Sequence, residues 1–109
     1  MVEGSRQDLV AFAGTVKQEK LSVFETSNHQ KGALSKLSLH DEMLGELVDC
    51  LDKASQDTSL PKEDAAAAKA QHDATVKLQA KIQQQLRAIK GASSSQNAKT
   101  LIGNLSLAP

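Results

Sequence analysis

Aromatic residues, cysteine and proline are scarce in this chain of 109 residues. It has no Trp or Tyr, two Phe, one Cys and two Pro. The low aromatic content, beside many Leu, Ala, Lys, Glu and Gln residues, favours packed helices over a β-sandwich or a barrel. The single cysteine, Cys50, excludes a disulfide within one chain and is typical of a reducing compartment.

Long hydrophobic runs are also missing. No apolar stretch approaches the roughly 20 residues that a membrane-spanning helix needs. The first ten residues lack the charged and then apolar layout of a signal peptide. We therefore expect a cytoplasmic protein without a membrane partner.

No cluster of catalytic or metal-binding residues stands out in the sequence. His29, His40 and His72 lie in different segments without a nearby Cys or His, so we expect no zinc site. His40 and Cys50 would lie about 15 Å apart along one predicted helix, too far for a nucleophile and its base. The glycines are scattered singly and form no phosphate-binding loop. We predict no enzymatic activity, no metal and no cofactor.

Charge is balanced over the whole chain but not along it. Residues 1–60 carry six Lys or Arg and ten Asp or Glu, whereas residues 61–109 carry seven and three. The basic residues of the second half do not form one stripe, and no Tyr or Trp is present to stack on bases. We therefore expect no nucleic-acid partner.

Hydrophobic periodicity predicts three helices. They cover about residues 6–27, 39–57 and 61–90. We expect them to form an all-α domain over residues 5–91, an antiparallel three-helix bundle, and a monomer. The polar stretch 27–32 ends in Gly32 and is predicted to be a turn. The heptad phase of the leucines continues through this stretch, which leaves one uninterrupted helix as an alternative.

Residues 92–109 begin with the composition of a linker, Ala-Ser-Ser-Ser-Gln-Asn. We predict a flexible C-terminal tail here. Four apolar residues farther along leave a short docked helix open as an alternative. These residues are Leu101, Ile102, Leu105 and Leu107.

Residues 39–54 separate most clearly into two helical faces. A helix turns by about 100° per residue, which places the apolar side chains on one side and the carboxylates on the other. The apolar positions are Met43, Leu44, Leu47, Leu51 and Ala54. The carboxylates are Glu42, Glu46 and Asp49, with Asp52 at their edge. We predict a core-facing side and an acidic stripe that suits a basic partner.

Two stretches of this region carry a family resemblance. The first is Leu21-Ser22-Val23-Phe24-Glu25-Thr26, which a polar turn containing Gly follows. In the second, Glu42 stands ten residues before Asp52. Together they resemble the BAG domain, most of all its plant-type members, over about residues 5–90. The resemblance implies a three-helix bundle, with a first helix that ends in the Phe-Glu-Thr stretch. Such a bundle binds the ATPase domain of 70-kDa heat-shock chaperones and promotes nucleotide exchange.

The resemblance also implies which residues contact the chaperone. Glu42, Asp49 and Asp52 match acidic positions on the second helix of the family. On the third helix, the family's pair of an aliphatic residue and Gln matches either Leu78-Gln79 or Ile82-Gln83. In these two registers Gln71-His72 or Thr75-Val76 stands where the family has Arg-Lys. The predicted partner-binding residues are Glu42, Glu46, Asp49, Asp52, Gln79 and Gln83.

The missing Arg-Lys pair and the apolar residues after Gly91 support a second hypothesis. In it the chain is a generic helical adaptor or oligomerisation module for another protein partner, without chaperone binding. Leu101, Ile102 and Leu105 would then form the surface through which copies associate.

Overall fold

Four helices make up the fold in a computed structural model that describes residues 2–18 and 23–107. They are α1 (Val2–Gln18), α2 (Val23–Ser55), α3 (Lys62–Lys90) and α4 (Ser95–Gly103). No strand occurs in either of these two ranges. The all-helical prediction is confirmed, but there are four helices in place of the predicted three. No described helix is both long enough and apolar enough to cross a membrane.

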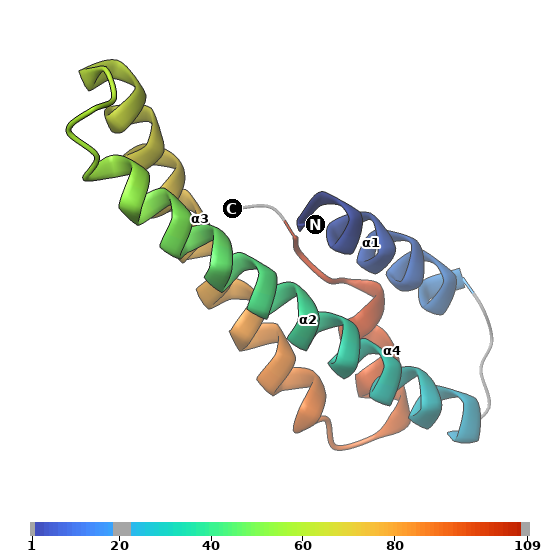
Figure 1. Ribbon diagram of the computed structural model, residues 1–109. Coiled ribbons are helices and arrows are strands. Elements are labelled where there is room, and N and C mark those ends of the chain that lie inside the picture. The colour runs from blue at the N-terminus through green and yellow to red at the C-terminus, as the bar shows by residue number, and fades with distance from the viewer. Residues whose placement is uncertain (1, 19–22, 108–109) are drawn as a thin grey trace.

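Helices α2 and α3 form a long hairpin in which the two helices run in opposite directions (Figure 1). At its base, the side chain of Gln30 donates to the Ile89 carbonyl at 2.8 Å. Farther along, the side chain of Gln83 donates to the Asp41 carboxylate at 3.1 Å. After the connecting turn, Pro61 occupies the position directly before α3 and makes no side-chain capping hydrogen bond.

Helix α2 is continuous over 33 residues, so the predicted turn at residues 27–32 is wrong. Thr26 before this stretch and Ala33 after it are both buried, and this packing offsets the roughly 1 kcal/mol that a glycine costs inside a helix. Gly32 itself lies against the Phe12 ring of α1, since a Cβ there would stand 3.5 Å from the ring. The helix is thus uninterrupted across residues 27–32, as the heptad phase allowed, but it does not extend back to Leu9, because α1 and α2 are separate helices.

The first helix also differs from the prediction. Helix α1 ends at Gln18, and Phe24-Glu25-Thr26 lies in the first turn of α2 and not at the end of a first helix. Residues 19–22, which the predicted helix 6–27 includes, lie outside the described residues. The fold therefore departs from the first-helix boundary that the resemblance implies.

The buried core lies in one half of the molecule, where α1 and α4 pack against the hairpin (Figure 1). All four helices contribute side chains that are at most 1% exposed. These are Leu9, Val16, Ala33, Leu37, Leu44, Ile82, Ile89 and Ile102. The apolar sides of all four helices thus meet in a single cluster.

Helix α4 corrects the prediction of a flexible tail over residues 92–109. The Ser94 hydroxyl accepts the Asn97 backbone N–H at 3.2 Å and caps the helix, and Ala98 and Ile102 are buried. Beyond the helix, Leu107 is 8% exposed. The tail is a docked helix with a packed extension as far as residue 107; residues 108–109 lie outside the described residues.

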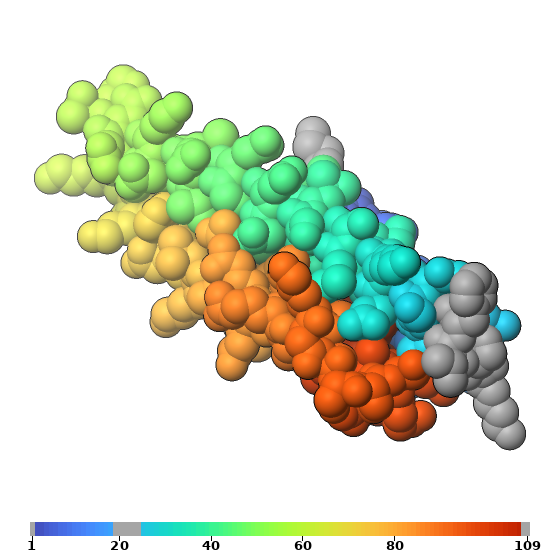
Figure 2. All heavy atoms as spheres, turned by 90° about the horizontal axis from the view of Figure 1, so that it is seen from below, coloured from blue at the N-terminus to red at the C-terminus, as the bar shows by residue number. Residues whose placement is uncertain are grey.

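The other half of the hairpin, residues 45–81, is a two-helix arm. No residue of this arm is buried, and every buried residue of the described chain lies within residues 9–44 or 82–107. The molecule measures 56 × 22 × 17 Å, and the arm extends beyond α1 and α4 (Figures 1 and 2). Because two helices bury less of each other than four do, Leu47 and Leu51 remain partly exposed there.

Candidate docking surface

Four carboxylates lie along the outer side of α2, and we call these residues the acidic face. Glu42, Glu46 and Asp49 fall within about 60° around the helix, and Asp52 lies about 60° farther toward α3. All four residues are exposed. The acidic stripe of the sequence is therefore a continuous surface feature of the folded chain.

The opposite side of α2 explains why this face is exposed. Leu37 and Leu44 are buried among α1, α3 and α4, and Leu47 and Leu51 continue the same side along the arm. An amphipathic helix that buries one side must direct the other toward solvent. The packing of α2 thus orients the carboxylates outward.

Most of the acidic face has no partner within the chain. Among the described residues, no side chain donates a hydrogen bond to Glu42, Glu46 or Asp49 or forms an ion pair with them. Asp52 accepts a hydrogen bond from Gln56 at 3.1 Å. Like charges three or four residues apart on a helix repel one another weakly, so cations on a partner would stabilise this arrangement. At least three carboxylates are available for such a partner.

Gln79 and Gln83 lie elsewhere, on the seam between α2 and α3. Their side chains donate to Asp41, from Gln79 to the backbone carbonyl at 3.5 Å and from Gln83 to the carboxylate at 3.1 Å. Both residues are partly buried. The structure gives these glutamines a role in joining the two helices, and their contact with a partner stays a prediction.

The structure does not bring Cys50 and His40 together. Cys50 is exposed, whereas His40 is fully buried on another side of α2. Over residues 2–18 and 23–107, no three His, Cys, Asp or Glu side chains are grouped closely enough to hold a metal ion.

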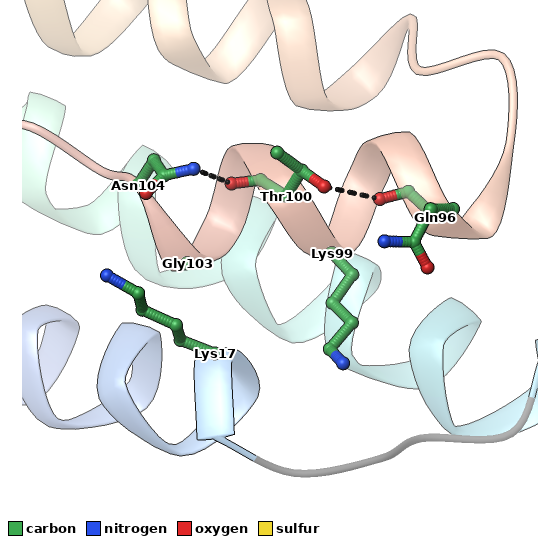
Figure 3. A pocket seen from close by; sticks show the side chains of 6 residues that line it. All are labelled: Lys17, Gln96, Lys99, Thr100, Gly103 and Asn104. Carbon is green, nitrogen blue, oxygen red and sulfur yellow. Dashed lines mark hydrogen bonds between the residues drawn. The ribbon is translucent and has the colours of Figure 1, made fainter.

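One depression lies along α4, where the C-terminal end of α1 approaches it (Figure 3). Its volume of about 190 Å³ is below the range of roughly 300–1,000 Å³ that is typical of ligand pockets. The Thr100 hydroxyl and the Asn104 amide already donate to backbone carbonyls of α4. The side chains of Lys17 and Lys99 extend in different directions (Figure 3), so this depression lacks the convergent polar groups of a binding site.

Two polar contacts of α2 were not anticipated from the sequence. Asp41, beside the acidic face, is the acceptor for both seam glutamines, and its place between the two faces of the helix is the signal in the sequence that could have indicated such a role. His40 is buried against Ser5 of α1 at 3.0 Å. That contact joins residues 35 positions apart, and helical periodicity carries no information about such pairs.

No protein-family model, curated protein or solved structure matches this chain. Any functional proposal therefore depends on the residues and on their arrangement.

Proposed function

We propose that this chain is a co-chaperone module that resembles a BAG domain and docks its acidic face on a basic surface of a 70-kDa heat-shock chaperone ATPase domain. The observation that carries this proposal is the row of exposed carboxylates on α2, three of which have no partner among the described residues. The resemblance over residues 21–52 supplies the class of partner, because its acidic positions coincide with Glu42, Asp49 and Asp52.

The position of the face favours docking. Glu46, Asp49 and Asp52 lie on the two-helix arm, which extends beyond α1 and α4 (Figure 1). A partner can therefore approach these carboxylates without contact with the other two helices. Charge complementarity of this kind mainly accelerates association and selects the partner.

The proposed mechanism is a population shift and involves no chemistry on this chain. The module binds the open form of the nucleotide cleft more tightly than the closed form. Bound ADP then leaves faster, and the acceleration is limited by the ratio of the two affinities.

Calorimetric titration into a purified chaperone ATPase domain tests the proposal, with the release of labelled ADP followed in parallel. We expect micromolar binding and accelerated release. The double variant Glu42→Gln with Asp49→Asn keeps the side-chain shapes and removes two charges, and it should bind at least about tenfold more weakly. A matched control, Glu63→Gln with Asp64→Asn, removes two exposed carboxylates outside the acidic face and should bind like the unmodified chain.

Two outcomes would contradict the proposal. Equal affinity of both double variants would exclude the acidic face from the interface. No binding by the unmodified, folded chain would exclude this partner and favour the generic helical adaptor. The tail-mediated form of that adaptor already meets an obstacle, since Ile102 is fully buried and Leu105 packs against the core of the same chain.

A further inference from the structure

One ionisable side chain lies inside the core. His40 has no exposed surface, and its Nδ1 lies 3.0 Å from the hydroxyl oxygen of Ser5 on α1. Its Nε2 is buried without a hydrogen-bond partner. The imidazole thus joins α1 to α2 through one nitrogen, while the other faces an environment without a polar partner.

The neutral ring fits this environment better than the charged ring. If Nδ1–H donates to the Ser5 hydroxyl, Nε2 carries no hydrogen and is an acceptor without a donor. Protonation then adds an N–H with no acceptor, and a buried donor of this kind is costly. If the Ser5 hydroxyl donates instead, Nε2 already carries the hydrogen, and protonation at Nδ1 requires the hydroxyl to turn and accept. In both tautomers the charged ring is buried with an Nε2–H that has no acceptor.

The charges around His40 come from two helices. Arg6 of α1 is one residue from Ser5, and its guanidinium also donates to Glu3 at 3.0 Å. Asp41 neighbours His40 on α2, and Gln83 of α3 donates to it. One turn away, Lys36 of α2 pairs with Asp8 of α1 at 2.7 Å. The buried core residues of α3 and α4 are apolar: Ile82, Ile89, Ala98 and Ile102.

These groups together disfavour the imidazolium. Burial lowers the pKa of His40 below its ordinary value of 6.5, the Arg6 charge lowers that pKa further, and Asp41 opposes the change. The Asp41 carboxylate does not reverse the direction.

We propose that His40 is a pH-sensitive latch for α1, whose protonation in mildly acidic solution releases α1 from α2. Helix α1 is the N-terminal helix of the fold. Leu9, Ala13 and Val16 are its buried residues, Val2 and Phe12 pack beside them, and Ser5 and Asp8 make polar contacts with α2. Terminal elements commonly open at lower free energy than the centre of a fold. Release uncovers the side of α2 that carries Leu37 and Leu44, continuous with Leu47 and Leu51 on the arm.

The direction of the pH effect follows from linkage. When α1 is detached, His40 regains a pKa near 6.5, so the open state binds a proton at a higher pH than the closed state does. The contact between α1 and α2 is therefore fully stable above about pH 6.5 and weakens as the pH falls below that value. Between pH 7.5 and pH 5.0, the opening constant of α1 should rise severalfold and by at most about 30-fold.

NMR on the whole chain tests this latch. The first measurement is the pKa of His40 from its ring signals, which we expect below 6.5. The second is the protection of α1 amides against hydrogen exchange, corrected for intrinsic exchange rates, at pH 7.5 and 5.0. Amides of α3 serve as the internal reference, and α1 protection should fall relative to them at pH 5.0. A His40 pKa at or above 6.5, or unchanged α1 protection, would overturn the proposal.

Substitutions of single histidines show which one causes the pH dependence of α1 protection. His40→Leu fills a similar volume without a titratable group, and its α1 protection should not change with pH. His72→Gln, on the exposed arm, should behave like the unmodified chain. His29 also contacts α1, with its ring 5.6 Å from that of Phe12, so loss of the pH dependence in His29→Gln and not in His40→Leu would contradict the proposal. If His40→Leu does not fold, the two measurements on the unmodified chain decide.

Discussion

Gln83 of α3 donates its side-chain amide to the carboxylate of Asp41 on α2 at 3.1 Å. Asp41 directly precedes Glu42, the first residue of the acidic face, so this hydrogen bond fixes the seam of the hairpin beside the proposed docking surface. The sequence contains five carboxylates between residues 41 and 52. Asp41 differs from the other four because a side chain of α3 reaches it.

Gln83→Ala should lower the free energy of unfolding by about 0.5–1.5 kcal/mol, because it removes a partly buried hydrogen bond to a charged acceptor. Urea unfolding followed by circular dichroism measures this change. Gln84→Ala is the matched control, since Gln84 is exposed and its loss should cost less than about 0.5 kcal/mol. Equal effects of the two substitutions would show that the contact with Asp41 contributes nothing measurable.

Ile102→Ala should destabilise the protein by about 2–5 kcal/mol, since this residue of α4 is fully buried in the core. Its neighbour Leu101 is 37% exposed, and Leu101→Ala should cost less than about 1 kcal/mol. Chemical unfolding of both variants provides the comparison. A small loss in Ile102→Ala would mean that α4 does not pack on the hairpin in solution and that the predicted flexible tail is correct.

Gly14→Ala should stabilise the protein by about 0.5–1 kcal/mol. Gly14 lies within α1, and a Cβ there would meet nothing within 4 Å, so alanine adds helix propensity without a clash. Thermal and urea unfolding measure the gain. Gly103→Ala is the contrasting variant, because its Cβ would stand 3.1 Å from the Cβ of Lys17 and should destabilise the contact between α1 and α4. A gain in both variants would contradict the close approach of these helices.

Ser59→Ala should raise the pKa of Asp57 toward its ordinary value of 3.8. The Ser59 hydroxyl and backbone N–H donate to Asp57 at 2.6 and 2.9 Å, and both lower the pKa of that carboxyl. The variant loses the hydroxyl and retains the N–H, so the pKa rises but remains below 3.8.

Carbon-13 NMR of the Asp57 carboxyl follows this titration. The stabilisation from Asp57 is complete above about pH 3.8 and is lost as the pH falls through the lowered pKa. Ser55→Ala should leave the Asp57 pKa unchanged, because the Ser55 hydroxyl donates to the Asp52 backbone carbonyl. An equal rise in both variants would exclude a specific role for Ser59.

The sequence by itself determined the features that depend on local propensity and on the period of a helix. Almost all of residues 62–90 are good helix formers, with Pro61 before them and Gly91 after them, and α3 has nearly the predicted bounds. The helical spacing of apolar and acidic residues within residues 39–54 likewise determined which side of α2 carries carboxylates. These features follow from about 3.6 residues per turn and from the chemistry of each side chain.

Only the tertiary structure decided the features that depend on contacts between distant residues. Gly32 is part of a helix because Thr26 and Ala33 on either side of the polar stretch are buried, and α4 is docked because Ile102 reaches a core that α1, α2 and α3 also form. The burial of His40 against Ser5 and the reach of Gln83 to Asp41 depend on the same packing. Helical periodicity identifies the side of a helix that is buried, whereas the choice of partner depends on how the four helices share one small core.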